Sequence, residues 1–93
     1  MRYRILVAPP AQKEIKDLPG YVRAQARELL EALASNPRPA RAKELRDRPR
    51  VYRLWLARRW RIAYAVDDEL LEIRILRVRL KDHIGYETLT PEG

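Results

Sequence analysis

The first residues of the chain change from a strand pattern to a helix pattern at a pair of prolines. Tyr3, Ile5 and Val7 are apolar at every second position, which predicts a half-buried strand. Pro9-Pro10 ends that strand and suits the start of a helix. Apolar residues then recur at i, i+4 and i+7 as far as Leu18, so we expect a short helix there.

A second helix is predicted between two further breaks in the pattern. Pro19-Gly20 precedes it and Asn36-Pro37 ends it. Its apolar face comprises Val22, Ala26, Leu29, Leu30 and Leu33. Residues 36–49 carry Pro37, Pro39 and Pro49 without periodicity, so they are expected to form a loop that brings the chain back across the fold.

Three strand patterns follow in close succession. The first two, Val51–Ala57 and Trp60–Val66, are separated only by Arg58-Arg59, which requires a hairpin. A polar turn at residues 67–69 leads to a third run, Leu70–Leu80. The alternation in this run slips by one residue at Ile75-Leu76, which predicts either a β-bulge or a strand buried on both faces.

The order of these elements predicts an α+β fold of the type β-α-α-β-β-β. Consecutive hairpins build a three-stranded antiparallel meander, and the two helices cover one face of the sheet. Residues 82–93 are polar and end in Pro91-Glu92-Gly93, so we expect a short helix or strand remnant and then a loose tail. Residues 1–93 are expected to form a single domain, because 93 residues can bury one modest core.

Composition excludes several classes of protein. With 46% hydrophobic residues the chain is a folded globule, and no apolar run approaches the roughly 20 residues of a membrane span. The N-terminal apolar stretch is too short for a signal peptide, so we expect a cytoplasmic protein with no membrane partner. The chain has no cysteine and one histidine, His83, which argues against a metal site and a Ser-His-Asp triad.

Positive charge is concentrated in the middle of the chain. The net charge is +7, and 16 of the 20 cations are arginine. By segment the net charge is +3 over residues 1–40, +7 over residues 41–66 and −3 over residues 67–93. A concentrated positive field favours a polyanion, because neutralised phosphates release their counterions.

The predicted hairpin sends one set of side chains toward the helices and the other set to the open face of the sheet. The inward set is Tyr52, Leu54, Leu56, Trp60, Ile62, Tyr64 and Val66, and the outward set is Val51, Arg53, Trp55, Ala57, Arg61, Ala63 and Ala65. Arg53, Trp55 and Arg61 therefore share an exposed face. Cations beside an aromatic platform suit single-stranded nucleic acid, whose bases stack on the ring.

Residues after the last strand add candidate acid–base groups to this face. Lys81, His83 and Tyr86 are expected to curl back over it, beside Arg53 and Arg61. Cleavage of RNA without a metal needs a base for the 2′-OH, cations for the charge on phosphorus and an acid for the 5′-oxygen. His83 has an ordinary pKa near neutrality, while Lys81 or Tyr86 would serve if nearby arginines lower their pKa.

The chain as a whole resembles the RelE/ParE superfamily of bacterial toxins from type II toxin–antitoxin systems. The resemblance covers roughly residues 3–86. Its carriers are the segment from Ala11 to Lys16-Asp17-Leu18-Pro19, then Leu33-Ala34-Ser35-Asn36-Pro37, Lys43-Glu44-Leu45-Arg46, Tyr52-Arg53-Leu54 and Trp60-Arg61-Ile62-Ala63-Tyr64-Ala65-Val66-Asp67.

This resemblance implies a RelE-like fold, a cognate antitoxin as partner, and no small-molecule cofactor. In the RelE branch it also implies ribosome-dependent cleavage of mRNA by 2′-OH attack. By position the resemblance implies roles for Arg61, Arg53, Lys81 and Tyr86. With the residues chosen by their chemistry and placement added, the expected catalytic residues are Arg61, Lys81, His83 and Tyr86, and the expected RNA-binding residues are Arg53, Trp55, Arg58, Arg59 and Arg79. Lys81 and Arg79 are interchangeable as the family's C-terminal basic residue.

Two departures from the RelE branch keep other readings open. Trp55 stands where that branch has a second lysine, and Val78-Arg79-Leu80-Lys81 replaces its valine-glycine-histidine-arginine, with His83 displaced. A ParE-like protein that blocks DNA gyrase by binding would need no acid–base set. A degenerate relative that is not toxic is the third possibility.

Overall fold

Prolines set the boundaries of the N-terminal elements in the computed structural model, which describes residues 2–86 and 89–91. Strand β1 (Arg4–Val7) ends before Pro9 and Pro10, which occupy the first turn of helix α1 (Pro9–Lys16). Their missing N–H groups cost nothing there, because the first turn has no partner for them. Helix α2 (Gly20–Ser35) starts directly after Pro19 and ends at Asn36, whose φ of −143° is not helical.

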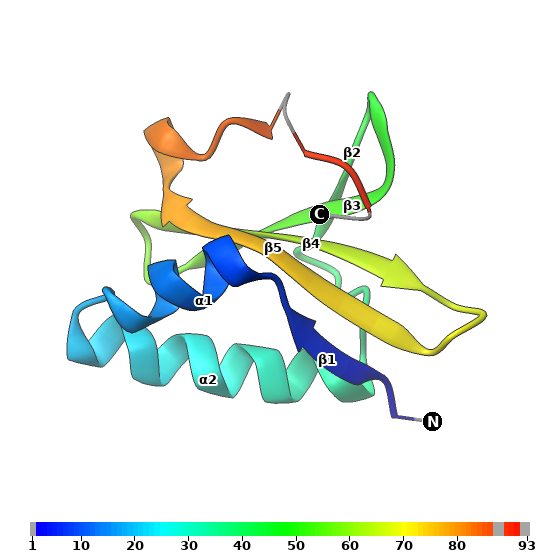
Figure 1. The fold of residues 1–93 in the computed structure, drawn as a ribbon, viewed down its shortest axis with the longest axis horizontal. Coiled ribbons are helices and arrows are strands. Elements are labelled where there is room, and N and C mark those ends of the chain that lie inside the picture. The colour runs from blue at the N-terminus through cyan, green and yellow to red at the C-terminus, as the bar shows by residue number, and fades with distance from the viewer. Residues whose placement is uncertain (1, 87–88, 92–93) are drawn as a thin grey trace.

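Both helices pack on one side of a five-stranded sheet (Figure 1). The apolar face predicted for the second helix is confirmed, because Val22, Ala26 and Leu33 are buried against the sheet and Leu29 and Leu30 are partly buried there. Within the described residues, no helix has the length and apolar character needed to cross a membrane.

The remaining strands are β2 (Lys43–Leu45), β3 (Arg48–Leu56), β4 (Trp60–Asp67) and β5 (Glu72–Leu80). The spatial order is β1-β5-β4-β3-β2. Strands β3, β4 and β5 form the predicted antiparallel meander, and β1 pairs with β5 in parallel. The predicted α+β class is confirmed, while the sheet is mixed and has one strand more than expected.

The extra strand corrects the expectation of a loop over residues 36–49. Lys43 and Glu44 pair with Arg53 and Tyr52 of β3, and the register shifts after Glu44. The Glu44 side chain accepts a hydrogen bond from the backbone N–H of Arg50 at 2.9 Å, which closes the tip of this hairpin. A three-residue strand beside two prolines gives no period to detect, so the sequence pattern missed it.

The predicted irregularity in the last strand is a β-bulge. Ala63 pairs with Arg77 and Tyr64 with Ile75, so Leu76 is the unpaired extra residue. The bulge lets Ile75 and Val78 both join the core beneath the helices, while Leu76 packs on the other face.

A second, smaller core lies on the face of the sheet opposite the helices. Here Ile84 and Leu89 from the C-terminal segment pack with Ala63, Ala65 and Leu76. Figure 1 shows this segment (orange to red) crossing the sheet on the side away from α1 and α2. The expectation of a loose tail is therefore wrong for the residues described, because the small alanines leave room for the chain's own apolar side chains. The tail residues 87–88 and 92–93 lie outside the described residues.

The short helix expected in this region is a 3₁₀ turn over Lys81–His83.

The β3–β4 hairpin differs slightly from expectation, because β3 ends at Leu56 and not at Ala57. Ala57 and Arg58 have φ of 48° and 67°, which end the strand and turn the chain. The loop between β3 and β4 therefore has three residues, 57–59, and the first two have positive φ.

Candidate functional site

Strand register places the basic and aromatic residues of the β3–β4 hairpin on one face. Trp55 is directly opposite Arg61, and Arg53 is directly opposite Ala63. Residues directly opposite one another point to the same side of the sheet. Arg53, Trp55 and Arg61 therefore share the face that the helices leave open, whereas the inward set packs in the core with Leu54 and Ile62.

Arg61 is buried on this face, with only 3% of its surface exposed. Its Nη1 donates hydrogen bonds to the carbonyl oxygens of Arg58 at 3.1 Å and Trp60 at 2.8 Å. The indole of Trp55 lies over the guanidinium at 4.2 Å from the ring centroid. No carboxylate among the described residues pairs with Arg61.

These contacts hold a cation in place without neutralising it. Carbonyl dipoles and an aromatic face stabilise a guanidinium but carry no net negative charge. Both hydrogen bonds use Nη1, so the other N–H donors have no acceptor within the described part of the chain. The expectation that Arg61 is exposed is wrong, because Trp55 and the hairpin turn cover it. Its burial nevertheless favours an anionic ligand, because electrostatic interactions strengthen where water is excluded.

Tyr86 brings a hydroxyl to the same arginines. Its Oη is buried and has no hydrogen-bond partner within the described residues. Burial raises the pKa of Tyr86, and the positive charges of Arg53 and Arg61 act in the opposite direction. The hydroxyl thus lies within the electrostatic field of both guanidiniums. An unpaired buried hydroxyl costs about 1–3 kcal/mol, which a ligand that bonds to it would recover.

A cavity of about 280 Å³ opens beside Tyr86. Its other walls come from the β2–β3 turn: Leu45, Arg46, Asp47 and Arg48. Periodicity does not single out Arg46 or Arg48, because the segment that contains them shows no helix or strand pattern. Their membership of the dense middle run of positive charge is the only signal that could have found them.

Arg79 lies opposite Arg61 in the sheet but is held by other groups. Its Nε pairs with Glu14 of α1 at 2.8 Å, and its Nη1 donates to the backbone oxygen of His83 at 3.0 Å. Glu14 also pairs with Arg77 and accepts a hydrogen bond from the backbone N–H of Val78. Glu14 therefore fixes the end of β5 and the start of the C-terminal segment. The sequence pattern placed it on a polar helix face and gave no reason to single it out.

The other predicted residues lie around the β3–β4 turn. Arg58 and Arg59 are exposed in the turn, and the backbone oxygen of Arg59 accepts a hydrogen bond from the backbone N–H of Lys81 at 2.9 Å. Lys81 and His83 are exposed in the 3₁₀ turn. Within the described residues, neither side chain forms a hydrogen bond or an ion pair with Arg61 or Tyr86. The structure thus brings together Arg53, Trp55, Arg61 and Tyr86 as one cluster, which we call the arginine–tyrosine cluster.

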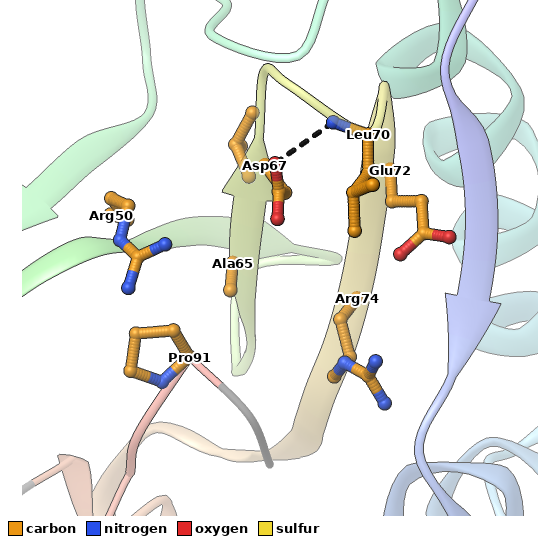
Figure 2. A pocket seen from close by; sticks show the side chains of 8 residues that line it. Arg50, Ala65, Asp67, Leu70, Glu72, Arg74 and Pro91 are labelled. Atoms are coloured by element: carbon orange, nitrogen blue, oxygen red, sulfur yellow. Dashed lines mark hydrogen bonds between the residues drawn. The ribbon is translucent and has the colours of Figure 1, made fainter.

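A separate cavity of about 150 Å³ lies at the far end of β4, beside the β4–β5 turn (Figure 2). Arg50 and Arg74 line it together with Asp67 and Glu72. The Asp67 carboxylate already accepts hydrogen bonds from the backbone N–H groups of Glu69 and Leu70. In Figure 2 the two guanidiniums stand apart and do not converge on one point. With both signs of charge in its walls, this cavity is a weaker anion site than the arginine–tyrosine cluster.

Residues 2–86 and 89–91 contain no group of three histidine or carboxylate side chains placed to hold a metal ion.

Comparisons with known proteins agree on one family of folds. The sequence model described as "ParE toxin of type II toxin-antitoxin system, parDE" matches residues 5–84. No curated protein matches the chain by sequence.

Three solved structures illustrate the structural likeness. The isolated E. coli RelE toxin superposes with a TM-score of 0.76 at 26% identity, over 92% of each chain. The intact E. coli RelBE toxin–antitoxin complex gives 0.75 at 29% identity, over 84% of this chain and 95% of that one. The RelBE2 complex of Mycobacterium tuberculosis gives 0.74 at 25% identity, over 87% of this chain and all of that one.

Proposed function

The chain belongs to the ParE toxin family of type II toxin–antitoxin systems, and we propose, on the geometry of its arginine–tyrosine cluster, that it is an endoribonuclease that cleaves mRNA on the ribosome without a metal ion. It is a toxin of the RelE/ParE type. A cognate antitoxin is its partner, as the similar E. coli and M. tuberculosis complexes support. Its targets, mRNA and the ribosome, would be met in the cytoplasm.

The proposed reaction uses the RNA's own 2′-hydroxyl as nucleophile. A base takes the 2′ proton while the 2′-oxygen attacks phosphorus, the bond from phosphorus to the 5′-oxygen breaks, and an acid protonates that oxygen. The products are a 2′,3′-cyclic phosphate and a 5′-hydroxyl. Arg61 and Arg53 stabilise the charge that develops on phosphorus. Tyr86 supplies one of the two proton transfers, and Lys81 or His83 supplies the other.

One observation carries this proposal: the guanidinium of Arg61 is buried on an accessible face with no negative partner among the described residues. A structural arginine at such a position normally has a carboxylate, because an unpaired buried charge is costly. Here the cation is held by carbonyls and by Trp55, so its charge is not neutralised and would act on a phosphate bound at the open face. The unpartnered hydroxyl of Tyr86 in the field of the same arginines supports the same conclusion.

Primer extension on mRNA, with and without ribosomes, tests the activity. We expect the wild type to produce cut mRNA only with ribosomes. Arg61→Ala should reduce the cleavage rate by roughly 100-fold or more, because it removes the main stabiliser of the transition-state charge. Arg74→Ala, a charge-matched control in β5 away from the cluster, should cleave like the wild type. Undiminished cleavage by a folded Arg61→Ala protein would contradict the proposal.

A second candidate is inhibition of DNA gyrase by binding. It is favoured by the match to the ParE family model, and by Trp55, which stands where the RelE branch carries a lysine. Under this alternative, toxicity should survive Tyr86→Phe, and induction should cause DNA breaks without cut mRNA. A degenerate relative would cause neither effect and would not slow growth.

A further inference from the structure

A groove leads away from the arginine–tyrosine cluster around the β3–β4 turn to helix α2. It consists of two hollows of about 500 and 640 Å³ that share Gln25 and Ala57. The first is lined also by Glu28, Leu29, Arg41, Trp55 and Leu56, and the second also by Tyr21, Arg58 and Arg59. We call this the turn groove. Because Trp55 contacts Arg61 and also lines the first hollow, the groove is continuous with the candidate site.

Each hollow contains an exposed aromatic ring. Trp55 is 56% exposed although its ring covers Arg61, and Tyr21 is 64% exposed. Among the described residues the other large apolar side chain that is more than half exposed is Leu70. Aromatic residues normally bury most of their area, so two exposed rings along one groove suggest a flat ligand surface that stacks on them.

The groove is also positively charged. Arg41, Arg58 and Arg59 line it against a single acidic residue, Glu28. None of the three arginine side chains has an ion pair among the described residues. Arg58 has a positive φ, a backbone conformation that costs a non-glycine residue about 1–2 kcal/mol. A side chain kept at a strained position on an exposed turn is consistent with a binding role.

We propose that the turn groove binds the nucleotides of single-stranded RNA that flank the cleaved bond. This inference rests on the proposed function, because the strand enters the groove from a phosphate held at Arg61. Bases stack on Trp55 and then on Tyr21, while Arg58 and Arg59 contact the phosphates between them. A protein ligand fits less well, because the groove offers separate rings among cations and no continuous apolar stripe for a helix to cover.

Fluorescence anisotropy with a labelled eight-nucleotide 2′-O-methyl RNA tests the inference, because this RNA cannot be cleaved. Tyr21→Ala and Arg58→Ala should each weaken binding roughly 5- to 100-fold. Leu70→Ala is the matched control, because Leu70 is equally exposed but lies at the β4–β5 turn. The affinity of Leu70→Ala for the RNA should equal that of the wild type. Tyr21→Ala binding as tightly as Leu70→Ala would overturn the proposal.

A length series separates this inference from the nuclease proposal. If Tyr21 stacks on a flanking base, Tyr21→Ala should weaken binding of the eight-nucleotide RNA but not of a dinucleotide, which occupies only the cluster. If the wild type did not cleave mRNA but Tyr21→Ala still weakened binding of the longer RNA, the nuclease proposal would be wrong and the RNA-binding role of the turn groove would hold. Equal losses for both lengths, or binding of the antitoxin at Tyr21 without any effect on RNA, would overturn the groove.

Discussion

Arg61 and Tyr86 are buried polar groups whose capacity for hydrogen bonds exceeds what their described neighbours use. Arg61 donates only from Nη1, and the Tyr86 hydroxyl has no partner within the described part of the chain. Such groups destabilise a folded protein unless a ligand completes them. Stability and activity should therefore respond in opposite directions to changes at these residues.

Tyr86→Phe tests this opposition. The change removes a buried hydroxyl that makes no hydrogen bond to any described residue, so the free energy of unfolding should stay the same or rise by about 1 kcal/mol. Cleavage should fall by roughly 100-fold or more, as expected for loss of a proton-transfer group. Urea unfolding and ribosome-dependent primer extension measure the two quantities. A variant that is both less stable and fully active would show that Tyr86 has a packing role only.

A second residue-scale prediction concerns Asp68 at the β4–β5 turn. Hydrogen bonds from Arg38, at 2.7 and 3.1 Å, and from the Tyr3 hydroxyl, at 2.6 Å, hold the pKa of Asp68 below its ordinary value. The stabilisation is present above the unfolded pKa of about 3.9 and is lost as pH falls through the lower folded pKa.

Asp68→Asn should consequently lower the urea midpoint at pH 7 and have little effect at an acidic pH below the lowered pKa of Asp68. Asp47→Asn in the β2–β3 turn provides a matched control, and its urea midpoint should stay close to that of the wild type at both values. If the Asp68→Asn deficit persisted unchanged in acid, the ion pair with Arg38 would not be its cause.

Among the elements, the β3–β4 hairpin carries three residues of the arginine–tyrosine cluster and also has a strained backbone in its turn. Ala57 and Arg58 both have positive φ, although neither residue favours it. The same turn supplies the carbonyl of Arg58 that holds Arg61. Asparagine and glycine adopt positive φ more readily than alanine and arginine, so a sequence optimised only for stability would have Asn-Gly at these two positions.

Replacing Ala57-Arg58 by Asn-Gly should raise the free energy of unfolding by about 1 kcal/mol, since both residues tolerate positive φ. RNA affinity should fall as much as in Arg58→Ala, because both variants lose the same guanidinium. Arg58→Ala itself retains the strain and should show no gain in stability. Denaturant unfolding of the two variants in parallel gives the comparison, and equal stability would mean that the turn is not strained.

Periodicity predicted the elements that have a period and missed what depends on contacts distant in sequence. The faces of β3 and β4 and the bulge at Leu76 follow from alternation. The three-residue strand β2 was too short to give a pattern, and nothing in residues 3–7 indicates that β1 lies beside β5. The candidate residues could be chosen by chemistry and face. The burial of Arg61 and the anchoring of Arg79 by Glu14 could not, because both depend on tertiary packing.

For the whole molecule, the important arrangement is a sheet packed on both faces. The helices cover one side, and the C-terminal segment covers part of the other through Ile84 and Leu89. The arginine–tyrosine cluster lies beside this second core, which includes Tyr86 at its margin. The small core therefore positions the candidate catalytic hydroxyl.

Ile84→Ala should cost about 2–5 kcal/mol in unfolding free energy, because Ile84 is 3% exposed. Cleavage at a temperature where the variant remains folded should also fall, as Tyr86 loses its support. Leu70→Ala, at an exposed position, should change stability by less than about 0.5 kcal/mol. Thermal unfolding and primer extension test both effects. Full activity in Ile84→Ala would separate the second core from the site.

The parallel pairing of β1 with β5 also affects the order in which the protein is completed during its own synthesis. Arg4 pairs with Glu72 and Val7 with Ile75, so β1 can join the sheet only after β5 has been synthesised. At about 5–20 residues per second, roughly 3–14 s of translation separate the two. Tyr86 emerges later still. A nascent chain therefore cannot complete its sheet before β5 has been made, and under the proposed function it cannot cleave mRNA before that point.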